Sequence, residues 1–213
     1  TGRWPSSSGR SLAVLDHHLA PLRFDASGLH GSECRRGEET WCDYAVPAPF
    51  RRAVDDLKRR FDAEAGLLIE DKGKAVSLHW REAPHRAEDA VAALSAIARG
   101  LGDAYRIQRG KAVAELVPAG ASKGTAIAQF LTAPPYLDRC PVFIGDDLTD
   151  EQGFEVVNER GGLSAHVGSD PTLAQFRFRS PAEVRAALRR WAEGEPIGFS
   201  PALSASTSTT DLP

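Results

Sequence analysis

The alternation of hydrophobic and polar residues between positions 49 and 118 predicts a repeated helix–hairpin unit. Four apolar residues recur at the spacing of one helical face, with charged residues opposite: Phe50, Val54, Leu57 and Phe61. A strand with period-two alternation follows, with three residues on one face: Val76, Leu78 and Trp80. A second amphipathic helix and a second hairpin, which turns at Arg109-Gly110, complete the order αββαββ. This order predicts an antiparallel sheet with two helices on one face.

The flanking segments predict a different architecture, in which helices alternate with parallel strands. Before the repeated unit we expect a helix over residues 11–19, a short strand at Leu22–Phe24 and a polar segment to Pro47 that marks a domain boundary. After it we expect strands at 142–144 and 163–167, and a last helix that begins at the capping box of residues 180–183. The fold class is therefore α/β with an inserted α+β segment.

Composition narrows the class of protein. The 213 residues have a net charge of −3, which argues against binding to nucleic acid or to an anionic membrane surface. No apolar run is long enough to span a membrane. Three scattered cysteines without zinc-ligand spacing (Cys34, Cys42 and Cys140) predict thiols in a reducing compartment, and hence a cytoplasmic protein.

Three carboxylates follow the strand at 142–144: Asp146, Asp147 and Asp150. Ligands bind at the carboxyl ends of strands in open α/β sheets, and hard oxygen ligands suit Mg²⁺. Thr149 or Asp150 is expected to cap the helix from Glu151 to Asn158. The pattern alone is equally compatible with a solvated acidic turn that contains a capping Asp.

Lys123 is a second candidate functional residue. It lies in the first turn of a helix that Ser122 can cap, where the helix dipole disfavours a cation. Such a lysine often has another role, although an ordinary surface lysine is the commoner case.

The chain resembles the trehalose-6-phosphate phosphatases of the haloacid dehalogenase superfamily. Seven short stretches in family order, between about residue 8 and residue 190, carry the resemblance: Ser8-Gly9-Arg10-Ser11 with Leu15-Asp16, 28–33, 70–73, 79–84, 113–118, 120–124 and 145–151. The resemblance implies a Rossmann-like core with an inserted αββαββ cap. It divides the chain into a first core part (8–40), the cap (41–118), a second core part (119–195) and a disordered tail (196–213).

The resemblance also implies a chemistry: Mg²⁺-dependent hydrolysis of trehalose 6-phosphate, the last step of trehalose biosynthesis, through an aspartyl-phosphate. Ser8 and Lys123 would hold the transferring phosphoryl group, Asp146 would ligate Mg²⁺, and Asp147 and Asp150 would lie close to the metal. Six residues would hold the substrate: Arg10, His30, Gly31, Glu70, Lys72 and Glu115. His79 and Arg81 are interpreted as polar residues of the strand. The expected partner is this small molecule, with neither nucleic acid nor membrane.

The sequence departs from the family at its start. The family's Asp-x-Asp-Gly-Thr motif, which supplies the nucleophile and the acid/base, does not occur. No apolar strand precedes Ser8, and the chain contains no Met, so we expect a fragment that lacks two core strands and is inactive as given. Two alternatives stay open: a phosphatase for another sugar phosphate, such as sucrose phosphate or mannosylglycerate phosphate, and a non-catalytic sugar-binding remnant.

Overall fold

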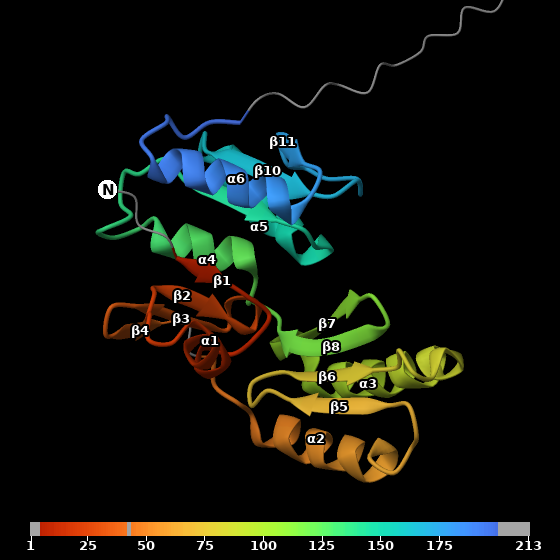
Figure 1. Ribbon diagram of the computed structural model, residues 1–213. Coiled ribbons are helices and arrows are strands. Elements are labelled where there is room, and N and C mark those ends of the chain that lie inside the picture. Colours follow the sequence, from red (N-terminus) through yellow and green to blue (C-terminus); the bar gives the residue numbers. More distant parts are fainter. Residues whose placement is uncertain (1–4, 42–43, 200–213) are drawn as a thin grey trace, which may run out of the picture. The chain divides into compact units, whose positions relative to one another are not determined.

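The computed structural model describes residues 5–41 and 44–199. The chain divides into two compact units, residues 1–130 and residues 131–213 (Figure 1). Most of the predicted disordered tail, residues 200–213, lies outside the described residues, as does Cys42. Within the described ranges, none of the helices combines the length and apolar character that a membrane span requires.

The first unit begins with a small mixed sheet of strand order β1-β2-β3-β4. Its elements are β1 (Ser6–Ser7), α1 (Leu12–Leu19), β2 (Ala26–Gly28), β3 (Glu33–Arg36) and β4 (Glu39–Trp41). Strand β1 pairs in parallel with β2, although the sequence has no apolar run before Ser8 and predicted no strand there. The helix predicted over residues 11–19 is confirmed, with Ser11 as its N-cap.

The strand predicted at Leu22–Phe24 is wrong, because the strand lies four residues later, over Ala26–Gly28. Leu22 and Phe24 are 60% and 37% exposed, whereas Ala26 is buried. The carbonyl of Phe24 accepts a hydrogen bond from Arg35 instead of joining a ladder. The prediction from hydrophobicity therefore selected the wrong residues, because the buried strand consists of residues with small side chains.

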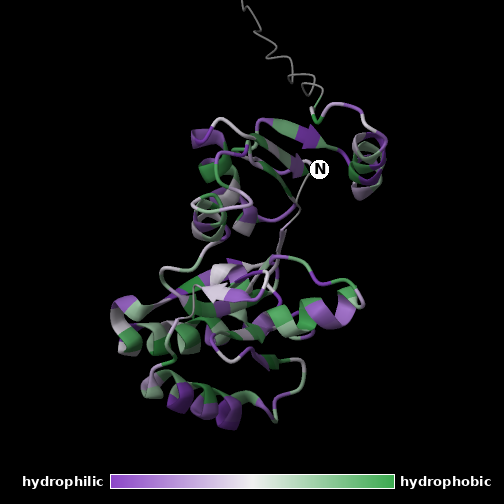
Figure 2. Ribbon diagram, turned by 90° about the vertical axis from the view of Figure 1, so that its left-hand side faces the viewer, coloured by the Kyte–Doolittle hydropathy of each residue, from purple (hydrophilic) through white to green (hydrophobic). Residues whose placement is uncertain are grey.

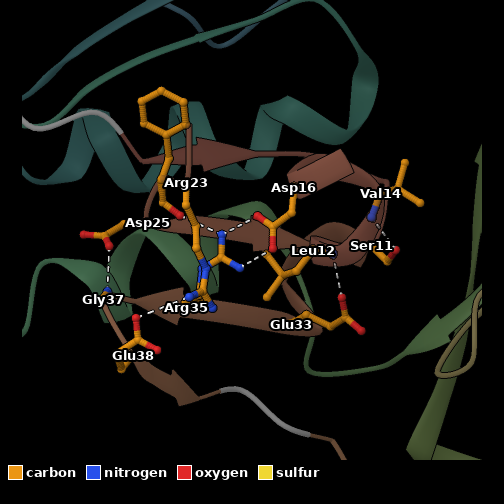
Figure 3. A network of polar contacts seen from close by, with 11 residues as sticks. Ser11, Leu12, Val14, Asp16, Arg23, Asp25, Glu33, Arg35, Gly37 and Glu38 are labelled. Carbon is orange, nitrogen blue, oxygen red and sulfur yellow. Dashed lines mark hydrogen bonds and ion pairs between the residues drawn. The ribbon is translucent and has the colours of Figure 1, made fainter. Parts of the chain in front are cut away.

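The polar segment after residue 32 forms the antiparallel β3–β4 hairpin, where the sequence predicted only a charged boundary segment. Arg35 is buried, and its guanidinium donates two hydrogen bonds of 2.7 Å to the carboxylate of Asp16 in α1 (Figure 3). These hydrogen bonds lower the pKa of the Asp16 carboxyl below its usual value. A charged residue can thus be buried in this strand because a partner from another element satisfies it.

The predicted αββαββ order is confirmed in the second part of this unit. Its elements are α2 (Ala48–Phe61), β5 (Leu68–Asp71), β6 (Val76–His79), α3 (Ala87–Leu101), β7 (Tyr105–Gly110) and β8 (Val113–Pro118). The four strands form an antiparallel sheet of order β5-β6-β8-β7. One apolar cluster joins the two helices to the sheet, and it includes Phe50, Leu94 and Leu78. Both helices therefore cover the same face of the sheet, and α2 shows alternating hydrophobic and hydrophilic bands (Figure 2).

The helix α4 (Lys123–Phe130) ends the first unit. The second unit contains β9 (Val142–Gly145), α5 (Glu151–Glu159), β10 (Leu163–Val167), β11 (Phe176–Phe178) and α6 (Pro181–Ala192). Its three strands form a parallel sheet of order β11-β10-β9. The predicted parallel strands are confirmed. The predicted helix after Ser180 is also confirmed, and the Ser180 hydroxyl accepts a hydrogen bond from the Glu183 amide at its start.

We expect Arg35→Met to lower the free energy of unfolding by about 1–2 kcal/mol at pH 7. The substitution removes charge-assisted hydrogen bonds to Asp16, which is partly exposed, so the effect is moderate. The folded-state pKa of Asp16 is depressed. The contribution is therefore complete above the unfolded pKa of about 4 and is lost as the pH falls through the lower folded-state pKa. Urea unfolding of both proteins across the acid range measures it.

Arg23→Met is the matched control, because it removes the exposed pair of Arg23 with Glu38. It should change the free energy of unfolding by less than about 0.5 kcal/mol. The interpretation of Arg35 is wrong if the difference between Arg35→Met and the natural protein does not shrink at the acid end.

Backbone amides should exchange slowly in β6 and β8 and faster in β9. Strands β6 and β8 each pair on both sides, and their residues Val76, Leu78 and Leu116 are fully buried. Among the described residues, β9 pairs on one side only, with β10, and its residues are half-buried. Hydrogen exchange followed by mass spectrometry or NMR measures this, and equal protection of the three strands would contradict it.

Candidate active site

One row of polar residues crosses the antiparallel sheet on the face opposite to α2 and α3. The pairing registers place Glu70 opposite Ser77, Ser77 opposite Glu115, and Gln108 opposite Glu115. Directly opposed residues of a sheet point to the same face, whereas the flanking apolar residues point to the helices. The fold therefore brings one residue of each strand into a single polar row.

Ion pairs connect this row to Lys72, in the turn between β5 and β6. The ammonium Nζ of Lys72 lies 3.1 Å from Glu115 Oε1 and 3.7 Å from Glu70 Oε2. His79 Nε2 lies 3.3 Å from Glu70 Oε2. Lys72 thus contacts both of the other predicted substrate residues on this sheet, Glu70 and Glu115. His79, which the sequence assigned only to the polar face of the strand, belongs to the same network.

His30 joins the network from a different segment of the unit. Its Nε2 lies 3.2 Å from Glu115 Oε2, and a Cβ at Gly9 would lie 2.6 Å from the same nitrogen. Among the described residues, no hydrogen-bond partner reaches the buried Nδ1 of His30. The backbone here is strained, because Leu29 and His30 have φ values of 46° and 54° in the region that disfavours side chains.

Glu115 is buried but stays ionised. Burial is the largest single influence on its carboxyl and raises the pKa, but His30 and Lys72 together outweigh it, so the pKa is lowered. Both carboxylate oxygens are engaged, one by Lys72 and the other by His30. The result is a fixed, ionised acceptor on the sheet face, of the kind that binds hydroxyl donors.

Ser8 and Arg10 lie against the loop that carries His30. The Ser8 amide donates to Ser27 O at 2.9 Å, and the His30 amide donates to Ser8 O at 3.1 Å. The Ser8 hydroxyl accepts a hydrogen bond of 3.1 Å from the Arg10 amide, and the side chain of Arg10 is exposed. The loop of residues 8–10, at the end of β1, is therefore held by backbone contacts to the segment 27–30.

Lys123 begins α4, and the preceding residue contacts the same strained segment. Gly31 has a φ of 103°, and a Cβ there would lie 2.2 Å from Ser122 O, so only glycine fits. Ser122 caps the helix as predicted, since its hydroxyl accepts a hydrogen bond of 2.9 Å from the Thr125 amide. Lys123 is 8% exposed. The first turn of α4 thus lies beside the loop that carries His30.

The three aspartates of the second unit have different environments. Asp150 is buried, and its Oδ2 accepts hydrogen bonds of 3.0 Å from the amides of Asp146 and Asp147. A Cβ at Gly145 would lie 2.3 Å from Asp150 Cγ, so this loop requires glycine there. Asp146 and Asp147 are exposed. Asp150 therefore shapes the loop, and Asp146 presents a carboxylate at the end of β9.

The predicted cap of the following helix needs correction. Asp150 occupies the N-cap position of α5, but its side chain makes no capping hydrogen bond there. Asp147 caps the preceding 3₁₀ turn (Leu148–Asp150), because its Oδ1 accepts a hydrogen bond of 2.7 Å from the Leu148 amide. A turn of this kind before the helix is not visible in the residue pattern, since Asp is a good cap at either position.

Exposed carboxylates at a loop suit a hard divalent cation, so Asp146 and Asp147 fit a magnesium ion by ligand type. In the described parts of the chain, no group of three or more His, Cys, Asp or Glu side chains gathers into a metal site. That Asp146, Asp147 and Asp150 together surround a magnesium ion therefore stays a prediction.

The sequence did not single out two polar residues that make contacts in this region, His79 and Arg106. Arg106 Nη2 donates a hydrogen bond of 2.8 Å to the carbonyl of Ala121, just before α4. Strand alternation places Arg106 on the same face as Gln108 and therefore could have indicated it, but its partner in a loop could not be predicted.

The sequence is similar to those of known proteins. The family model described as trehalose-phosphatase matches residues 6–182. The trehalose-6-phosphate phosphatase of Escherichia coli (strain K12) is 39% identical over 178 residues, which are 83% of this chain and 66% of that protein. The chain thus spans slightly less than two thirds of the length of this curated relative.

Solved structures show the fold. The C-terminal domain of Candida albicans trehalose-6-phosphate phosphatase matches 90% of this chain and 78% of that chain, with a TM-score of 0.74 and 22% identity. A phosphatase of the haloalkanoate (HAD) superfamily from Bacteroides thetaiotaomicron matches 89% of this chain and 82% of that chain, with a TM-score of 0.62 and 17% identity. The predicted haloacid-dehalogenase-like fold is confirmed. Because the family model covers most of the chain, this protein belongs to the trehalose-phosphatase family.

Proposed function

We propose that the protein hydrolyses trehalose 6-phosphate to trehalose and phosphate, the last step of trehalose biosynthesis. The observation that carries the proposal is the network of Glu70, Lys72, Glu115 and His30 on the sheet face. Family membership and the printed name of the E. coli relative support the same substrate. No observation favours sucrose phosphate or mannosylglycerate phosphate.

The segment 41–118 acts as the cap that holds the sugar. Glu70, Lys72 and Glu115 provide two carboxylates and one ammonium group, which make charge-assisted hydrogen bonds with sugar hydroxyls. Their mutual pairing holds the side chains in place before the sugar arrives, which lowers the entropic cost of binding. Within this proposal His30 contributes through Glu115, and Arg10 and Gly31 contribute through the loops beside it.

The phosphoryl group binds at Ser8 and Lys123. The Ser8 hydroxyl can donate to a phosphoryl oxygen, since it accepts only from the Arg10 amide within the described contacts. Lys123 lies at the start of α4, where the helix dipole disfavours a lysine but favours an anion beside it. A bound phosphoryl group therefore compensates the unfavourable position of the lysine.

Asp146, with Asp147 beside it, would hold Mg²⁺, and Asp150 keeps their loop in shape through its two backbone hydrogen bonds. The chemistry that Mg²⁺ would supply is neutralisation of charge on a phosphate ester. We assign no nucleophile or acid/base to this chain, because its sequence carries no Asp-x-Asp-Gly-Thr motif. The cytoplasmic location also stays a prediction.

Glu115→Gln in the full-length protein should lower kcat/KM for trehalose 6-phosphate at least about tenfold more than kcat/KM for a small aryl phosphate. The aryl ester uses the phosphate site but not the sugar contacts. Glu88→Gln, at an exposed position of α3 in the same cap segment, is the matched control and should leave both values unchanged. Equal losses on both substrates would show that Glu115 serves the fold or the phosphate chemistry.

Asp146→Asn should raise the Mg²⁺ concentration required for half-maximal activity by about tenfold or more. An amide is a much poorer ligand than a carboxylate for a hard cation, while the shape of the side chain is kept. Activity is measured with both substrates across a magnesium titration. Asp170→Asn, at an exposed position of the same unit, should behave like the natural protein. An unchanged magnesium requirement in Asp146→Asn would show that the metal binds elsewhere.

A further inference from the structure

Arg106 makes a contact that is energetically unfavourable if its role is only structural. Its side chain is half-buried in β7, and one guanidinium nitrogen donates to the neutral carbonyl of Ala121 at 2.8 Å. Burial lowers the pKa of Arg106, and the charge of Glu115 opposes this, so the guanidinium stays protonated at neutral pH. A neutral carbonyl compensates the lost hydration of a half-buried charge only poorly. An apolar residue at this position would avoid that desolvation cost.

The carbonyl that Arg106 holds belongs to the loop that starts α4. Within this loop Ser122 and Thr125 bind each other: the Thr125 amide donates to Ser122 Oγ at 2.9 Å, and the Ser122 amide donates to Thr125 Oγ1 at 3.0 Å. These local bonds fix the shape of the turn but do not fix its position relative to other elements. The hydrogen bond from Arg106 and the close packing of Gly31 against Ser122 O contribute to that connection.

We propose that Arg106 is a positioning residue for Lys123 and thereby for the phosphoryl group. Ala121 is two residues before Lys123 and is fully buried, so a displacement of its carbonyl moves the first turn of α4. Arg106 lies in the sheet that also carries Glu115, so one sheet positions both the sugar-binding carboxylate and the phosphate-binding lysine. This inference rests on the function proposed above, and it extends it to a residue that neither motif nor charge pattern indicated.

The test uses Arg106→Met, which keeps the length of the side chain but removes every donor, and Arg106→Lys, which keeps the charge but loses the planar fork. Arg109→Met, at an exposed position of the same strand, is the matched control. The direct readout is calorimetric binding of inorganic phosphate in the presence of Mg²⁺, with trehalose binding measured in parallel. Hydrogen exchange of the Thr125 and Ala126 amides reports on the first turn of α4.

We expect Arg106→Met to weaken phosphate binding about tenfold, to leave trehalose binding within about twofold, and to accelerate exchange at Thr125 and Ala126. kcat/KM should fall by a similar factor for trehalose 6-phosphate and for the aryl phosphate. Arg106→Lys should restore part of the loss, and Lys123→Ala should show a larger loss of phosphate binding. If Arg106→Met does not fold, the graded effect of Arg106→Lys decides.

Two results would overturn the inference: phosphate binding within about twofold of the natural protein in both Arg106 variants, or a loss confined to trehalose and its phosphate ester. Failure of the proposed function has a different signature. If the natural protein cleaves the aryl ester but not trehalose 6-phosphate, the substrate is wrong, and the phosphate measurements still decide the role of Arg106.

Discussion

The ionised carboxylate of Glu115, buried on the sheet face, is the constraint on which the rest of the candidate site depends. Removing a carboxylate from water costs several kcal/mol unless nearby cations and hydrogen bonds compensate it. Lys72 and His30 provide this compensation, one at each oxygen. Strand β8, the turn after β5 and the loop that carries His30 must therefore keep one arrangement, because a shift of any of them leaves a buried charge unpaired.

The segment of residues 28–31 accepts backbone strain to make these contacts. Leu29 and His30 have positive φ values, which cost energy in residues with side chains, and Gly31 packs directly against Ser122. Such a conformation persists only where the surroundings over-determine it. Here the amide of His30 donates to Ser8 O, its ring reaches Glu115, and the amide of Leu29 donates to Arg10 O. One strained turn thereby aligns the loop of residues 8–10, the antiparallel sheet and the start of α4.

The aspartates of the second unit have different roles. Asp150 uses one carboxylate oxygen on two backbone amides and excludes any side chain at Gly145. The neighbouring Asp146 is thereby held at the end of β9 with an exposed side chain. A buried residue shapes the loop, and an exposed residue of the same type is available for a ligand.

The sequence by itself determined the elements whose information is local. The αββαββ order followed from periodicity, because each helix buries one stripe of apolar residues and each hairpin alternates. Family motifs singled out Glu70, Lys72, Glu115 and Lys123 in the correct elements. Local pattern failed at residues 22–24, where exposed apolar side chains resembled a strand, and in the β3–β4 hairpin, where the buried charge of Arg35 resembled a solvated boundary.

Only the tertiary structure decided which partners the charged residues meet. Glu115 pairs with His30, Arg35 with Asp16, and Arg106 with the carbonyl of Ala121, and each contact joins different elements. A polar residue carries the same sequence signal whether it faces water or a partner. The difference arises when packing removes the water, because a group that was solvated in the open chain must then find its partner in another segment.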